Sequence, residues 1–109
     1  MIAVSDTSPI CYLVLVGEVK ILPQLYSQVF VPAAVISELE HDDAPGAVRH
    51  WAANLPSWIS VQPNPGGGTV GMEKLQAGEQ AAILLAESIA ADMILLDEKS
   101  ARRVAAARG

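Results

Sequence analysis

The N-terminal stretch constrains the fold most, because an apolar run there ends abruptly on an acid. Ile2–Ser5 is apolar enough for a strand buried on both faces, and Asp6 follows it directly. Ser8 is a good N-cap and Pro9 suits the first helical position, where its missing N–H costs nothing. Open α/β sheets build their sites at the carboxyl ends of such strands. We therefore expect a central strand with Asp6 at a crevice.

The rest of the chain alternates between short apolar segments and helical patterns. Further strands are expected over 28–31, 58–61 and 93–96, helices over 9–16, 19–26, 33–40, 45–54, 78–91 and 98–108, and a loop over 63–68. Strands separated by helices imply a parallel sheet with right-handed crossovers. The 109 residues suffice for one small domain. The sequence predicts a single three-layer α/β/α domain over 1–109 with a central parallel sheet, ending after a helix where another strand would be expected.

Charge limits how this chain meets nucleic acid. The net charge is −5, from 12 acids and 7 bases, which argues against binding by general phosphate neutralisation. Acids that hold divalent cations remain compatible with a phosphate substrate. The segment 98–109 is basic, and its Arg102 and Arg103 are expected either to steer an RNA backbone or to be ordinary solvated charges.

Nothing in the sequence predicts secretion or a membrane partner. The N-terminus lacks a basic region, and the charge-free run 7–17 is too short to span a bilayer. A single cysteine, Cys11, suits a reducing compartment. We expect a cytoplasmic protein.

Four acids are placed so that they could share a site. Asp6 and Asp97 each follow an apolar strand, and in a parallel sheet both lie at the same edge. Glu79 opens the 78–91 helix, and Glu38 shares a helix face with Ala34 and Val35. Each acid also has a structural alternative: Asp6 and Asp97 as helix caps, Glu79 as a favourable charge at a helix N-terminus, and Glu38 as part of an exposed acidic run.

Carboxylates drawn into one pocket repel each other unless a cation is present. Oxygen-only ligands suit Mg²⁺ or Mn²⁺, and such ions activate water and stabilise phosphoryl displacement. Zinc is disfavoured, since His41, His50 and Cys11 form no ligand pattern. The acids therefore point to Mg²⁺ or Mn²⁺.

These motifs, in this order, resemble the PIN-domain family, and most closely its VapC-like toxin and predicted nucleic-acid-binding branch. The resemblance rests on Val4-Ser5-Asp6-Thr7-Ser8-Pro9, on Val31-Pro32 leading to Ile36-Ser37-Glu38-Leu39, on Gly78-Glu79-Gln80-Ala81-Ala82, and on Leu95-Leu96-Asp97-Glu98-Lys99-Ser100-Ala101-Arg102. It implies a metal-dependent endoribonuclease, with the family's catalytic and metal-binding acids at Asp6, Glu38, Glu79 and Asp97. Thr7 and Ser8 fall where the family often has a hydroxyl near the metal. Family members continue past the position of Gly109 into a strand and a helix, so the domain is expected to be incomplete at its C-terminus.

The resemblance also sets the expected partners and the alternatives. It implies an RNA substrate, an antitoxin-like protein partner and a homo-oligomer. One alternative is a catalytically impaired PIN-like module that self-associates or binds such a partner, motivated by the charge-free 9–16 helix. A phosphatase or small-nucleotide hydrolase would use the same metals.

Overall fold

The computed structural model describes residues 1–65, 75–97 and 99–103. The strands are β1 (Ile2–Ser5), β2 (Gln28–Pro32), β3 (Ile59–Gln62) and β4 (Met93–Leu95). The helices are α1 (Thr7–Leu15), α2 (Leu22–Leu25), α3 (Ala33–Glu40), α4 (Gly46–Ala53) and α5 (Ala77–Ser88), with a 3₁₀ turn, η1, at Val19–Ile21. Residues 99–103 are also helical. The expected elements are thus present, although the 66–68 part of the predicted loop, Glu98 and 104–109 lie outside the described residues.

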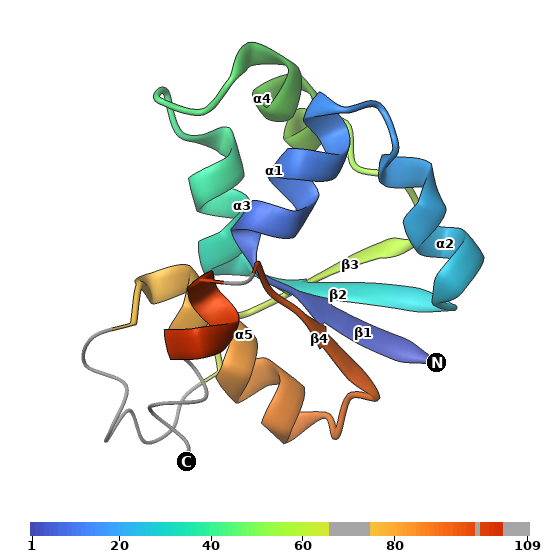
Figure 1. Cartoon of the computed structure of the whole chain (residues 1–109), viewed down its shortest axis with the longest axis vertical. Coiled ribbons are helices and arrows are strands. Elements are labelled where there is room, and N and C mark those ends of the chain that lie inside the picture. The colour runs from blue at the N-terminus through green and yellow to red at the C-terminus, as the bar shows by residue number, and fades with distance from the viewer. Residues whose placement is uncertain (66–74, 98, 104–109) are drawn as a thin grey trace.

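The four strands form one parallel sheet in the order β3-β2-β1-β4, as Figure 1 shows. β1 pairs with both neighbours, with Val4 opposite Phe30 of β2 and Ile94 of β4. The expected parallel sheet and the central position of the first strand are therefore confirmed.

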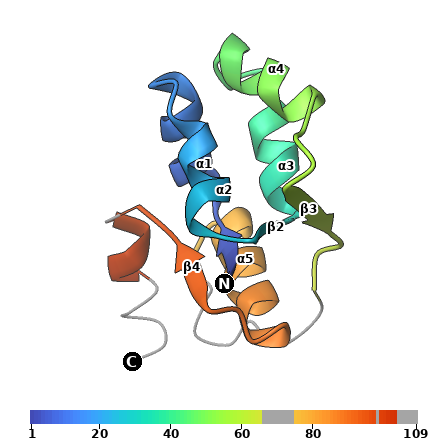
Figure 2. The ribbon, with the colours of Figure 1, turned by 90° about the vertical axis from the view of Figure 1, so that its right-hand side faces the viewer.

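Helices cover both faces of this sheet, so the chain has three layers (Figures 1 and 2). Val29 and Val31 of β2 face the larger core, which they share with α1–α4, whereas Val4 packs on the other face against Ala82 and Leu85 of α5. This alternation follows from the two-residue repeat of a strand.

The start of α1 differs from the expectation. The helix begins at Thr7 with Asp6 as the N-cap residue, so Ser8 and Pro9 are its second and third residues. The first four N–H groups of a helix have no partner within it, so proline is tolerated throughout the first turn. The earlier start brings Thr7 and Ser8 onto the helix beside Asp6.

The 19–26 segment also differs, because it divides into η1 and the four-residue α2, with Pro23 in the first turn of α2. Among the described residues, no single helix is long and apolar enough to cross a membrane. Only α1 together with residues 19–25 matches a span by length and composition, and that pair is bent by 118°.

Candidate active site

Asp6 lies at the carboxyl end of the central strand. Its backbone N–H donates to the Leu95 carbonyl at 3.1 Å, which ties it to the end of β4. The residue is only 3% exposed. Although Asp6 occupies the N-cap position of α1, its side chain makes no capping hydrogen bond. The capping alternative therefore accounts for its position but not for its carboxylate.

The other three predicted acids act on the Asp6 carboxylate. The pKa of Asp6 is raised from its ordinary 3.8 to about 6, and burial is the largest cause of this rise. The backbone N–H of Thr7 acts to lower the pKa, and the charges of Glu38, Glu79 and Asp97 contribute to raising it. The other three acids therefore lie within electrostatic reach of Asp6, at the end of β1.

Glu38 connects three helices at this edge. It is half-buried on α3 and accepts a hydrogen bond from the Thr7 hydroxyl of α1. It also accepts one from the backbone N–H of Gly78 in α5, at 3.2 Å. A Cβ built on Gly78 would lie 2.6 Å from Glu38 Oε2, so this approach requires glycine. The inward orientation predicted for Glu38 is confirmed.

Glu79 is the most enclosed of the four acids, at 1% exposed. It accepts the Gln76 N–H at 3.1 Å and thereby closes a capping box at the start of α5. Arg103 donates two further hydrogen bonds to it, at 3.0 and 3.2 Å. The helix-terminus alternative for Glu79 is thus correct in part, and its charge is balanced by an arginine.

Asp97 begins the last helical segment. Its side chain accepts the Ser100 N–H at 2.6 Å, and its carbonyl accepts the Ala101 N–H at 2.8 Å, so it is a helix cap as the alternative proposed. The Ser100 N–H is the main cause that lowers the pKa of Asp97, and the hydroxyls of Ser100 and Ser8 and the charge of Arg103 lower it as well. This environment keeps Asp97 ionised beside Asp6.

Arg103 corrects the expectation for the basic C-terminal segment. It is neither a solvated charge nor free to steer RNA, because it pairs with buried Glu79 and also donates to the Ser100 hydroxyl at 3.2 Å. These contacts raise the pKa of Arg103, chiefly through its hydrogen bonds with Glu79. Arg102, in contrast, is exposed.

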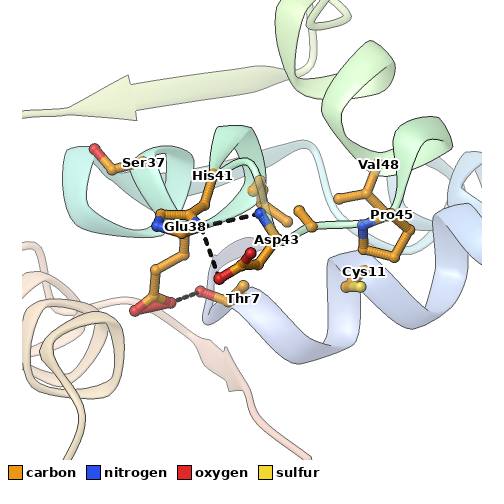
Figure 3. Close-up of a pocket in the computed structure, with 10 residues that line it drawn as sticks. Thr7, Cys11, Ser37, Glu38, His41, Asp43, Pro45 and Val48 are labelled. Carbon is orange, nitrogen blue, oxygen red and sulfur yellow. Dashed lines mark hydrogen bonds and ion pairs between the residues drawn. The ribbon is translucent and has the colours of Figure 1, made fainter.

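A pocket opens directly beside Glu38 (Figure 3). Its volume is about 440 Å³, and its lining is mostly apolar, with Cys11, Pro45 and Val48 at the end away from Glu38. Thr7 and Glu38 therefore belong both to the acid cluster and to the wall of this pocket. Nothing in the sequence indicates this pocket, because its wall combines α1, α3, α4 and the loop between α3 and α4.

The donor set fits a hard divalent cation. The carboxylates supply only oxygen ligands, and a cation would relieve both the burial of the Asp6 charge and the smaller repulsion from the other acids, which together raise the pKa of Asp6. Within the described residues, no three His, Cys, Asp or Glu side chains are arranged to hold one ion. A divalent ion at this edge would therefore be held by one or two carboxylates and by water.

Comparison with known proteins identifies the family. A family model described as a PIN domain matches residues 2–109, nearly the whole chain. No curated protein matches the sequence. The chain belongs to the PIN-domain family, whose members are generally nucleases that use divalent metal ions.

Proposed function

We propose that this PIN domain is a metal-dependent endoribonuclease that cleaves RNA phosphodiesters with carboxylate-bound Mg²⁺ or Mn²⁺. The observation that carries the proposal is the convergence of Glu38, Glu79 and Asp97 on the buried carboxylate of Asp6. A cluster of this kind attracts divalent cations and, without them, repels phosphate.

Each acid has a role that follows from its contacts. Asp6, Glu38 and Asp97 are the proposed ligands, with one or two of these carboxylates and several waters on each ion. Their protein partners leave lone pairs on the carboxylates: Glu38 accepts from Thr7 and Gly78, and Asp97 from Ser100. Glu79 adds negative charge from within its ion pair with Arg103. When bound, the metal supplies an activated water and stabilises charge on the phosphate. The three proposed ligands lie after the ends of β1 and β4 and on α3, and in this proposal the substrate phosphate binds beside Asp6.

Cleavage of a single-stranded RNA tests the proposal. Wild-type protein should cut it with Mg²⁺ or Mn²⁺ and stop in excess chelator. Asp6→Asn should lose activity and keep the fold, because asparagine is also a good N-cap. The matched control is Asp42→Asn, which removes an exposed carboxylate elsewhere. Equal cleavage by Asp6→Asn, or in chelator, would refute the proposal, and turnover of small phosphate esters but not RNA would favour a phosphatase instead.

A second candidate function, a binding module, is favoured by an apolar face. Leu15, Val16, Ile21 and Leu25, on and just after α1 and on η1 and α2, are 42–56% exposed. Such a face suits a second copy of the chain or an antitoxin-like protein, as the toxin of a toxin–antitoxin pair would require. Sedimentation tests self-association: Leu15→Glu with Leu25→Glu should convert a dimer to a monomer, and a wild-type monomer at high concentration argues against the homo-oligomer.

A further inference from the structure

A second pocket lies beside Asp97, another acid of the cluster. Its volume is about 560 Å³, and its wall includes Ser8, Tyr12, Leu13, Leu96 and Asp97. As with the first pocket, one of the four acids is part of the wall. The cluster is therefore flanked by two largely apolar cavities, one beside Glu38 and the other beside Asp97.

Helix α1 separates the two pockets. Thr7 and Cys11, four residues apart, line the first pocket, and Ser8 and Tyr12, also four residues apart, line the second. Residues four apart lie one above the other on a helix, so two adjacent stripes of α1 each form one wall. Asp6 precedes both stripes at the helix N-terminus.

Tyr12 is a large aromatic side chain on the surface of α1, a helix without charged residues. It is 63% exposed, so burial in the core does not explain it. Its ring lies at the second pocket together with Leu13 and Leu96, which offers a base an aromatic face and an apolar floor. Exposed aromatic rings of this kind hold unpaired bases by stacking.

The negative charge of the site favours ligand groups that are themselves uncharged. At a net charge of −5, with four acids at the site, phosphate neutralisation by basic side chains contributes little affinity. Bases are uncharged and planar, and they can enter apolar pockets without meeting this repulsion. Pockets on both sides of Asp6 would then supply the binding energy that places a phosphate between them.

We propose that the two pockets hold the two bases that flank the phosphate at Asp6, with Tyr12 stacked on the base in the second pocket. This inference rests on the proposed ribonuclease function and narrows its substrate to unpaired RNA with a base on each side of the cut. An RNA duplex is excluded, because its stacked bases cannot reach the pockets.

Abasic substrates test the two subsites. In a single-stranded RNA with a mapped cut, an abasic ribose on either side of the cut should raise KM about tenfold, the scale of one lost stacking contact. An abasic ribose three nucleotides away should have no effect. Ala44→Trp fills the first pocket and should reproduce the loss on one side only. Equal KM for all these RNAs would overturn the inference.

Variants of Tyr12 test the stacking. Tyr12→Ala should raise KM about tenfold on intact RNA and have no further effect on RNA that is abasic at its subsite, whereas Tyr12→Phe should match wild type. Ile89→Ala is the matched control, because Ile89 is an exposed apolar residue outside both pockets and outside the apolar face of α1, η1 and α2. An equal loss in Ile89→Ala would show that the loss of any exposed apolar side chain has this effect, and it would overturn the stacking role.

A binding assay separates this inference from the proposed function. An oligouridylate with a central 2-aminopurine is added, with Mg²⁺, to the Asp6→Asn protein, which leaves RNA uncut. Quenching of its fluorescence that disappears in Asp6→Asn/Tyr12→Ala supports the pockets, even where the wild type cleaves nothing and the ribonuclease proposal fails. Cleavage by the wild type without such quenching would refute the pockets alone.

Discussion

Arg103 and Glu79 form a bidentate ion pair within the acid cluster. Nη2 and Nε of Arg103 lie 3.0 and 3.2 Å from the two carboxylate oxygens. Arg103 is 29% exposed at its side chain, whereas the Glu79 side chain is 2% exposed. The pair joins the last described helix to the start of α5. It also places one cation among four carboxylates, which moderates their repulsion without neutralising the site.

Loss of Arg103 should therefore cost more stability than loss of Glu79. Arg103→Met leaves a buried carboxylate without its partner among three other acids, and an uncompensated buried charge is strongly destabilising. Glu79→Gln keeps a residue that can complete the capping box, and its freed arginine can reach water. Urea unfolding of both variants in chelator measures the order.

The Arg103→Met variant also tests whether Mg²⁺ binds in the acid cluster. Mg²⁺ should raise the melting temperature of Arg103→Met more than that of wild type, because the more negative cluster binds it more tightly and ligand binding stabilises the folded state. Adding Asp6→Asn should remove most of that gain. An equal Mg²⁺ shift in wild type and Arg103→Met would show that the ion does not bind in this cluster.

Ionised Asp6 should destabilise the fold in the absence of metal. Its pKa is raised to about 6 in the folded state, against 3.8 ordinarily, so the folded protein binds more protons between these values. Stability therefore falls as pH rises from about 4 to about 6, by about 3 kcal/mol in total, and is then level. Asp6→Asn stays uncharged, so it should be more stable than wild type at pH 7.5 and equal to it at pH 4.

Chemical denaturation in chelator at a series of pH values measures this difference. The lowered pKa of Asp97 does not interfere, since its contribution is lost only below about pH 4. Asp42→Asn again serves as the control, because Asp42 is exposed and lies outside the cluster. A wild type whose stability does not fall between pH 4 and 6 would contradict the buried, repelled state of Asp6.

The sequence was informative about the fold because most of its short strands are apolar runs, β3 alternates apolar and polar residues, and proline or glycine separates several helices from their neighbours. Gln28–Pro32 and Ala33–Glu40, for example, were predicted almost to the residue. The start of α1 was wrong because Ser8-Pro9 is a strong local signal, yet the hydrogen bond of Asp6 to Leu95 ends the strand and lets the helix begin at once. That contact joins residues 89 positions apart, so local patterns could not indicate it.

The four acids could also be predicted to share one edge, because parallel strands end together. The hydrogen-bond partners and the burial of each acid could not be predicted from the sequence. Arg103 lies three residues after Ser100, which places these two residues on one helical face, but only the packing against α5 shows that Glu79 lies opposite. Likewise, nothing local indicated that Gly78 leaves room for Glu38.

Gly78→Ala should impair activity while it leaves the fold intact. A methyl group there would lie 2.6 and 2.8 Å from the two oxygens of Glu38, so the carboxylate must move. Stability should change little, because alanine favours the helix by up to about 1 kcal/mol and offsets part of the clash. RNA cleavage and thermal melting together check this. Ala77→Gly, at the neighbouring exposed position, is the control; loss of activity there too would point to the helix rather than to Glu38.

Thr7→Val should separate the positioning of Glu38 from the packing of α1. Valine keeps the branched shape of threonine but cannot donate the hydrogen bond that Glu38 Oε2 accepts, whereas the Gly78 N–H still donates to Glu38 Oε1. A hydrogen bond to a charged group contributes about 1.5–3 kcal/mol, and half-buried Glu38 can recover part of this from water, so we expect a loss of about 1 kcal/mol in stability. Cleavage should fall about tenfold, since a misplaced ligand weakens catalysis. Thr7→Ser restores the donor and should restore cleavage. If Thr7→Val cleaves RNA as fast as Thr7→Ser, the hydrogen bond between Thr7 and Glu38 contributes only to the packing of α1 against α3 and does not position Glu38 for cleavage.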